Sequence, residues 1–242
     1  DSSHTIDSYR DCLNSFIDYL ARVENISRKK ISFHNFGKET IKRYQTWMIT
    51  EQGLAPKTCN LRLTAIRSFL EYAAQEYLWL MPVYTDACTI AGVKTPNHAI
   101  EYFEPDEMTA LLAAPSGTSR TDRRNQMMLI FLYDTAARVA EARQVKVSDL
   151  HLDAGVPYVT LLGKGRKYRN IPLMEKTVLH LKRYLKDFHR SDPKTDLPLF
   201  YAKAHGLLHE LSSDTFEKMI KRYAEQCREG GYPMPDRVHC HM

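Results

Sequence analysis

The segment from Gly163 to Leu173, GKGRKYRNIPL, concentrates basic side chains that could neutralise an anion. Four of the six residues from 164 to 169 are Lys or Arg, and a glycine stands on each side of the first lysine. A nucleotide P-loop needs two glycines that frame four residues, followed by Lys and then Ser or Thr, and this spacing is absent. Two interpretations remain: a solvated hairpin tip, or a hairpin whose basic tip contacts nucleic-acid phosphates.

A second candidate is Arg138, which stands at a break between two helical patterns in YDTAARVAEARQVKVSDL. The helix dipole disfavours a cation at a helix start, which favours an external anion as its partner over a plain surface role. The planar guanidinium can donate two parallel hydrogen bonds to a pair of phosphate oxygens. Glu141, three residues further on, is placed to support this arginine.

Composition bounds the class of protein. The 242 residues carry a net charge of +5, yet the segment 161–190 alone holds nine Lys or Arg and two acids. Hydrophobic content of 43% and charged content of 26% are typical of globular proteins rather than of disordered ones. Five cysteines without a CxxC pair favour reduced thiols in a cytoplasm-like compartment. No apolar run approaches a membrane span, and the first residues show no signal-peptide core.

The first ninety residues show helical periodicity, with amphipathic patterns at 3–23, 38–53 and 55–80. The third pattern contains two apolar rows, Leu61, Ala65, Phe69 and Tyr72, and Leu63, Ile66, Leu70, Ala73 and Tyr77. Three basic residues lie away from these rows, where they could face solvent or phosphates: Lys57, Arg62 and Arg67.

Periodicity is lost over residues 81–103, which contain Pro82, Gly92 and Pro96 and which we interpret as a connecting segment. We expect domains at 1–93 and 104–242, with the linker at 94–103. In the second domain we expect helices and one β-hairpin. The helical patterns lie at 104–114, 122–150, 174–190 and 212–231, and the hairpin lies at 156–173. The predicted fold is therefore mainly α with a small β-hairpin or sheet.

In this order, TAARVAEARQVKVSDL, GKGRKYRNIPL and the final HM resemble the tyrosine recombinase, or phage integrase, family. That family reads roughly Thr-Gly-x-Arg-x-x-Glu-x-x-x-Leu-x-x-x-Asp, then Gly-Lys-Gly-x-Lys-x-Arg-x-x-Pro-Leu, then His-x-x-Arg. LAPKTCNLRLTAIRSFLEYAAQE is similar to its DNA-clasping helical domain, so the resemblance covers nearly the whole chain. It implies a SAM-like core-binding domain and an α+β catalytic domain that is incomplete at its C-terminal end.

The resemblance implies roles for individual residues. Arg138 corresponds to the first catalytic arginine and Glu141 to the acid that follows it. Lys164, or less well Lys167, corresponds to the hairpin lysine that protonates the leaving 5′-oxygen. TAAR replaces the commoner Thr-Gly-Leu-Arg, which alters packing near the arginine and keeps its guanidinium. DNA contacts are expected from Lys57, Arg62, Arg67, Arg166, Lys167 and Arg169.

The end of the chain carries the last expected site residue. His241 corresponds to the histidine of His-x-x-Arg, with His239 as the alternative, because the Met after His241 fits the pattern better. The second catalytic arginine and the nucleophilic tyrosine then lie outside these residues, since no tyrosine follows His241. The HCH spacing alone is not a zinc signature, and we expect no metal site.

By this resemblance the parent protein is a site-specific recombinase of a mobile element, for integration or transposition. It cuts and rejoins double-stranded DNA through a 3′-phosphotyrosyl intermediate and needs no cofactor. The resemblance also implies a homotetramer on the recombination site, accessory bending or directionality factors, and a bacterial or phage protein of the cytoplasm, on the nucleoid. We expect the 242 residues alone to bind DNA without cleaving it. Two alternatives stay open: a non-catalytic DNA-binding protein, such as a regulator or decayed integrase, and a type IB topoisomerase.

Overall fold

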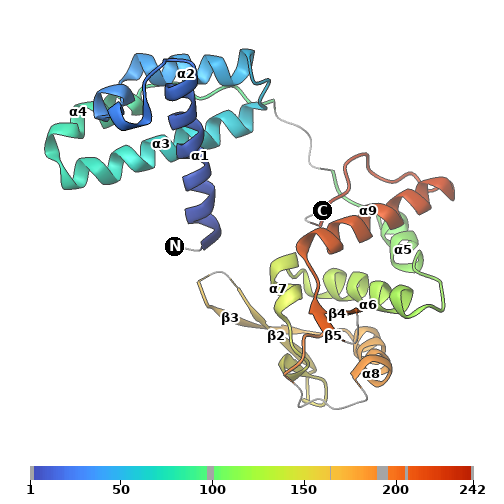
Figure 1. Cartoon of the computed structure of the whole chain (residues 1–242). Coiled ribbons are helices and arrows are strands. Elements are labelled where there is room, and N and C mark those ends of the chain that lie inside the picture. Colours follow the sequence, from blue (N-terminus) through green and yellow to red (C-terminus); the bar gives the residue numbers. More distant parts are fainter. Residues whose placement is uncertain (1–2, 97–100, 164, 190–195, 205–206, 241–242) are drawn as a thin grey trace. The chain divides into compact units, whose positions relative to one another are not determined.

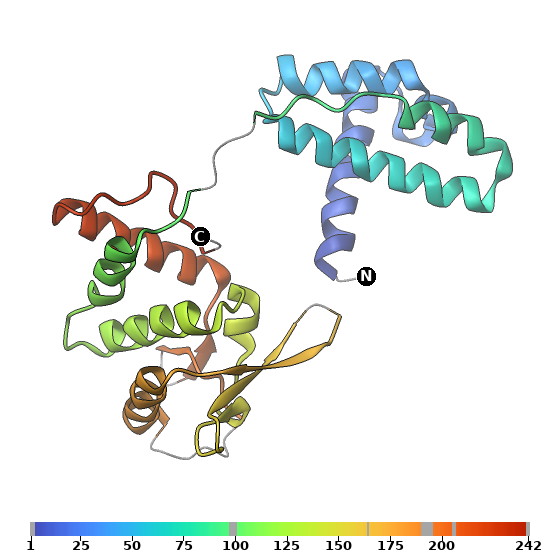
Figure 2. The ribbon, with the colours of Figure 1, turned by 180° about the vertical axis from the view of Figure 1, so that it is seen from behind.

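The computed structural model describes residues 3–96, 101–163, 165–189, 196–204 and 207–240. The chain forms two compact units, Asp1–His98 and Ala99–Met242, which we call the N-terminal and the C-terminal unit. Figure 1 labels their elements, and Figure 2 shows the same chain from behind. The fold is mainly helical with small antiparallel sheets, as the sequence predicts.

The N-terminal unit is built from helices packed around aromatic and aliphatic side chains. Its elements are α1 (Ser3–Arg22), η1 (Arg28–Lys30), η2 (Phe33–Phe36), α2 (Lys38–Thr50), α3 (Pro56–Glu76), η3 (Leu78–Leu80) and α4 (Met81–Cys88). Within this unit α1 crosses the other helices steeply in both views (Figures 1 and 2). The amphipathic pattern predicted at 38–53 is confirmed, because α2 buries one stripe of its side chains: Ile41, Tyr44 and Met48.

The expectation of a connecting segment from residue 81 onward was wrong for its first part. Residues 81–88 form α4, because Pro82 stands in its first turn, where the missing N–H removes no helical hydrogen bond. The apolar rows on α3 are buried only where other helices cover them. Their members Leu61, Tyr72 and Tyr77 are exposed, so the buried face of α3 is narrower than the two rows together.

The C-terminal unit combines helices with two small antiparallel sheets. Its elements are α5 (Pro105–Ala113), α6 (Arg120–Thr135), α7 (Val139–Gln144), η4 (Val147–Asp149), β1 (Leu150–His151), β2 (Tyr158–Leu162), β3 (Tyr168–Pro172), α8 (Glu175–His189), β4 (Tyr201–Ala204), β5 (Leu207–Glu210) and α9 (Ser213–Glu229). One sheet has the order β1-β2-β3, and β4 pairs with β5 in the other. Figure 1 shows β2 and β3 extending away from the helices of this unit.

Local signals set the helix limits of this unit. The backbone N–H of Glu104 donates to the Glu107 carboxylate at the start of α5, at 2.8 Å. At the start of α9 the Ser212 hydroxyl accepts from the backbone N–H of Thr215, at 3.2 Å. Gly230 closes the C-terminal end of α9. These starts and this stop are those that the sequence predicts.

The β4–β5 hairpin was not expected. The sequence of β5, LLHE, lacks the alternation of apolar and polar residues by which a half-buried strand is recognised, and every residue of the strand is exposed. In the part of the chain that the structure describes, no helix is both long and apolar enough to cross a membrane.

Candidate active site

The break between α6 and α7 presents Arg138. Helix α6 stops because Ala136 adopts a left-handed backbone conformation, with φ of 46°. The buried hydroxyl of Thr135 donates to the Phe131 carbonyl at 2.6 Å and accepts from the backbone N–H of Ala137 at 3.2 Å. Arg138 then takes the N-cap position of α7 with extended backbone angles, and 66% of its side chain is exposed. The predicted break is confirmed, and it places the guanidinium at the surface.

Glu141 lies under this arginine, one turn into α7. Its side chain is only 5% exposed, and its carboxylate accepts from the backbone N–H of Arg138 at 2.8 Å and from the Arg138 guanidinium at 3.0 Å. The support expected from the three-residue spacing is therefore present. The same carboxylate accepts two hydrogen bonds from Arg169 on β3, at 2.8 and 2.7 Å. One buried acid thus joins α7 to the β2–β3 hairpin.

The hydrogen bonds of Glu141 explain its acidity. The Arg169 guanidinium foremost, and then the donors of Arg138, hold the pKa of the Glu141 carboxyl down at about 2 although burial opposes ionisation. In return, the Glu141 carboxylate raises the pKa of Arg169. At neutral pH the Glu141 carboxyl is therefore ionised and Arg169 is charged.

The segment GKGRKYRNIPL forms the predicted hairpin. In the antiparallel ladder of β2 and β3, Leu161 pairs with Arg169 and Leu162 with Tyr168. The Gly163 N–H donates to the Lys167 carbonyl at 2.8 Å. Gly165 and Arg166 both adopt positive φ, 76° and 59°, which turns the chain at the tip. The next element is a strand rather than a helix, which leaves no place for a P-loop.

The tip of the hairpin is basic and accessible. Arg166 and Lys167 are exposed, and so is Tyr168. Lys164, the expected proton donor, lies outside the described residues.

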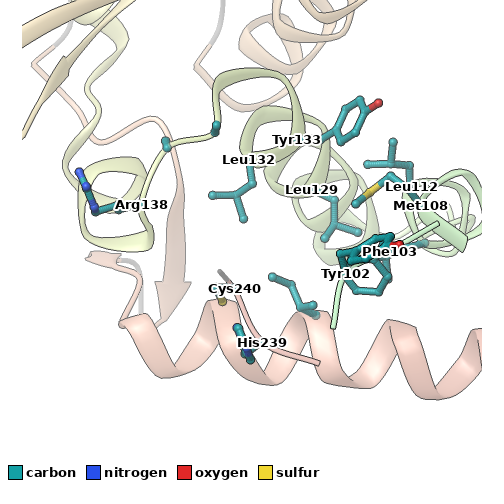
Figure 3. Close-up of a pocket in the computed structure, with 14 residues that line it drawn as sticks. Tyr102, Phe103, Met108, Leu112, Leu129, Leu132, Tyr133, Arg138, His239 and Cys240 are labelled. Atoms are coloured by element: carbon teal, nitrogen blue, oxygen red, sulfur yellow. The ribbon is translucent and has the colours of Figure 1, made fainter. Parts of the chain in front are cut away.

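A cavity of about 450 Å³ lies beside Arg138 in the C-terminal unit. Figure 3 shows Arg138 on α7 at one side, Leu132 and Tyr133 on α6, and His239 and Cys240 along α9. The lining is mostly apolar apart from the arginine and the histidine. The chain therefore returns, just before position 241, to the cavity that Arg138 also lines.

The C-terminal residues add little chemistry of their own in the described range. Burial raises the pKa of the Cys240 thiol to about 11, so it is protonated at neutral pH. His241 lies outside the described residues. Among the residues that are described, no group of three or more His, Cys, Asp or Glu side chains could hold a metal ion.

Known proteins share both units of this chain. The sequence profile of the phage integrase family matches residues 101–242, and that of the phage integrase SAM-like domain matches residues 1–86. The chain belongs to the phage integrase family. The resemblance drawn from its motifs is therefore confirmed, together with the predicted pairing of a SAM-like helical domain and a recombinase catalytic fold.

Relatives of this phage integrase family member are longer than the chain. It is 32% identical over 228 residues to the tyrosine recombinase XerD of Halalkalibacterium halodurans, covering 93% of this chain and 71% of that protein. It is 30% identical over 191 residues to a Sinorhizobium fredii relative named as an integrase/recombinase, y4rC, covering 79% of this chain and 57% of that protein. The solved structure of the XerH site-specific recombinase, bound to a palindromic difH substrate, shares the fold with a TM-score of 0.69 at 20% identity, over 98% of this chain and 65% of that one.

The basic residues expected to contact DNA in the N-terminal unit differ in their surroundings. Lys57 is exposed in the first turn of α3. Arg62 is half-buried and lines a polar cavity of about 340 Å³ with Asp11 and Arg22. The Arg67 guanidinium donates to the backbone carbonyls of two residues near the end of the unit, Ala87 and Ile90, and so serves packing within it. The contacts of these three residues with DNA stay predictions. The prediction for Arg67 has the least support, because its guanidinium is bonded within the unit.

The pairing of Arg169 with Glu141 is what sequence reasoning missed. Arg169 was expected to contact phosphate because it stands in a basic run, yet both of its terminal nitrogens are bonded to the buried carboxylate. The two residues are 28 positions apart. The only signal available was the alternation along β3, which places Arg169 with Ile171 on the face opposite to Tyr168.

Glu141→Gln is expected to lower the free energy of unfolding by about 2–3 kcal/mol at pH 7. A glutamine cannot ionise, so the variant loses the stabilisation that the lowered pKa of the folded-state carboxyl supplies at this pH. The folded pKa lies below the unfolded one, so this stability is present above about pH 4.3 and is lost as the pH falls through 2. Urea unfolding of both proteins at pH 7, 4.5 and 3.5 measures the difference, which should narrow at the lowest pH. A difference that stays constant would contradict the ionised carboxylate as its source.

Proposed function

We propose that this chain is the DNA-binding part and most of the catalytic part of a site-specific DNA recombinase. The observation that carries this proposal is Arg138, an exposed guanidinium at a helix N-cap, held by a buried carboxylate that also holds the basic hairpin. Such an arrangement fits the negatively charged phosphodiester of double-stranded DNA. Family membership and the XerH complex with its DNA substrate support the same conclusion.

The reaction we propose is attack of a tyrosine hydroxyl on a DNA phosphodiester. The tyrosine O–P bond forms, the bond from phosphorus to the 5′-oxygen breaks, and a proton goes to the leaving 5′-oxygen. Negative charge rises on the non-bridging oxygens in the transition state, where the Arg138 guanidinium would stabilise it. The phosphate stays bonded to the protein until a 5′-hydroxyl attacks it, so the energy for rejoining is conserved without ATP.

We assign the other steps to residues outside the described part of the chain. Lys164 would donate the proton to the leaving 5′-oxygen, and His241 would share the proton of the nucleophile or brace the phosphate. The tyrosine itself and the second arginine would come from a region of the parent protein beyond these 242 residues, since the relatives are longer. The fragment would then bind DNA without cleaving it.

The partners follow from the same proposal. The substrate would be a recombination site in double-stranded DNA of a mobile element, on the nucleoid of a bacterial cytoplasm. Joining two sites requires several copies, so we propose a homotetramer on two duplexes for the parent, with accessory DNA-bending or directionality factors.

Binding of the fragment to a DNA duplex should weaken steeply between about 50 and 200 mM salt, because each neutralised phosphate releases counterions. Arg166→Ala and Lys167→Ala should each reduce the slope of log Kd against log salt by about 1. Fluorescence anisotropy with a labelled duplex measures the slope. Lys218→Ala is the matched control, because that lysine is exposed on α9 and paired with Asp214. If the Kd of the wild type did not change with salt concentration, the proposal that basic side chains of the hairpin bind DNA phosphates would be wrong.

Covalent trapping tests the catalytic half of the proposal. The full-length parent, incubated with a nicked suicide substrate that carries the ends of its own element, should become linked to the 3′-phosphate. Binding without any covalent product would identify a non-catalytic DNA-binding protein on the same fold. Relaxation of supercoiled DNA without joining of two sites would favour a type IB topoisomerase.

A further inference from the structure

Arg169 lies on β3 in the second ladder pair from the turn, opposite Leu161, and its guanidinium is bonded to the buried Glu141 carboxylate rather than directed to the tip. We infer that Arg169 is a positioning residue: through Glu141 it fixes the β2–β3 hairpin to the helix that presents Arg138. This inference rests on the proposed function, because positioning matters only if Arg138 and the hairpin act on one phosphodiester. It replaces the direct phosphate contact that the basic run suggests for Arg169.

The hydrogen bonds of the Glu141 carboxylate form a closed set. One oxygen, Oε1, accepts from a guanidinium nitrogen of Arg138 at 3.0 Å and from one of Arg169 at 2.8 Å. The other, Oε2, accepts from the backbone N–H of Arg138 at 2.8 Å and from the second terminal nitrogen of Arg169 at 2.7 Å. A carboxylate has about four lone-pair sites, so these donors fill it. Removing any one donor leaves a buried charge partly unsatisfied.

The two arginines contribute to this set unequally. Arg169 gives both terminal nitrogens to the carboxylate in the bidentate geometry, and its side chain is 37% exposed. Arg138 gives one guanidinium nitrogen, and its side chain is 66% exposed. The two arginines therefore have different tasks. Arg138 keeps most of its guanidinium at the surface, whereas Arg169 uses both terminal nitrogens to bind the buried Glu141 carboxylate. An arginine suits the second task because its planar fork matches a carboxylate.

Gly163 follows β2 directly and faces Lys167 across the turn of the hairpin. A Cβ atom at this position would lie 3.4 Å from Glu141 Oε1 and 3.5 Å from a terminal nitrogen of Arg169. It would also lie 3.4 Å from the Lys167 carbonyl oxygen, which accepts the Gly163 N–H. These are ordinary van der Waals distances, so the chain at Gly163 packs beside the ion pair without crowding it. The other side of the hairpin therefore also lies next to the Glu141 carboxylate.

This contact controls geometry more than affinity. The hairpin extends away from the helices of its unit (Figure 1), and the Arg169–Glu141 contact holds it close to its turn, so loss of the contact would let the basic turn shift relative to Arg138. A displacement of about 1 Å between groups that act on one bond can lower a rate about 100-fold. Loss of the Arg169–Glu141 pair should therefore lower cleavage strongly while the charges that meet DNA stay in place.

The test compares Arg169→Ala and Arg169→Lys with Arg166→Ala in the full-length protein. For Arg169→Ala we expect single-turnover formation of the covalent complex on the nicked suicide substrate to fall by about 10- to 100-fold. Its Kd for the same duplex and its salt slope should stay within twofold of the wild type. Arg169→Lys should recover part of the rate, since one ammonium replaces one of two hydrogen bonds. Arg166→Ala should instead lower the salt slope by about 1.

Arg169→Lys keeps the test decisive if Arg169→Ala fails to fold. The variant keeps the positive charge but not the bidentate pairing, so it should lower the cleavage rate and leave the salt slope unchanged. A salt slope reduced by about 1 in Arg169→Ala would overturn the inference in favour of a phosphate contact. A cleavage rate within twofold of the wild type, with only the melting temperature lowered, would overturn it in favour of a purely stabilising pair. If the wild type itself forms no covalent complex, the proposed function fails first, and the inference fails with it.

Discussion

Arg138→Lys is expected to lower the rate of covalent complex formation by the full-length parent by about 100-fold or more, as for loss of a transition-state donor elsewhere. The reason is geometric. The guanidinium presents several N–H donors in one plane, of which the Glu141 carboxylate uses one guanidinium nitrogen, whereas an ammonium is a point charge. Single-turnover assays on a nicked suicide substrate, at saturating protein, measure this rate without a contribution from binding.

Two comparisons make the Arg138 result specific. Arg183→Lys changes an exposed arginine on α8 in the same way and should leave the rate near that of the wild type. Arg138→Ala should be at least as slow as Arg138→Lys, because it removes the charge as well. Equal rates for Arg138→Lys and the wild type would contradict the claim that the planar guanidinium of Arg138 binds the phosphate through two hydrogen bonds. A loss of DNA affinity of the same size as the loss of rate would place Arg138 in binding alone.

The environment of Arg138 was predictable because its determinants are local. Small residues at a break in helical periodicity, an acid three residues further on and a following amphipathic turn all lie within one short stretch of sequence. The structure adds that Ala136 adopts left-handed φ, where the family pattern has glycine. For a residue with a Cβ this conformation costs about 1–2 kcal/mol, and the buried Thr135 hydroxyl offsets part of it by bonding on both sides of the break.

The hairpin was predictable as an element and not in its connections. Two β-rich runs around a glycine-containing turn indicate a hairpin from sequence alone. Which side chain on β3 meets the buried acid of α7 depends on how the sheet packs against that helix, and the local pattern does not encode this. From the sequence alone, Arg169 was therefore interpreted as one more basic residue of the segment that contacts DNA. Its pairing with Glu141 becomes visible only when residues 28 positions apart are placed in space.

The second large effect is expected from Lys164→Ala in the full-length parent. Without a proton donor the 5′-oxygen leaves as an alkoxide, so cleavage should slow by about 10²–10⁴-fold, the range for a general acid. Binding to the uncut duplex should remain within a few fold, because one phosphate contact among several is lost at most. Covalent complex formation and anisotropy, measured on the same substrate, separate these two quantities.

A sulfur substitution decides whether the missing function is proton donation. When the bridging 5′-oxygen at the scissile bond is replaced by sulfur, the leaving group is a thiol, which is far more acidic than an alcohol and departs readily as the thiolate without a proton donor. Lys164→Ala should then cleave at nearly the wild-type rate, whereas Arg138→Lys should stay slow because charge still builds on the non-bridging oxygens. Rescue of both variants would mean that the chemical step no longer limits the rate with this substrate. Rescue of neither would reassign Lys164 to phosphate binding and leave Lys167, the other lysine of the hairpin, as the candidate donor.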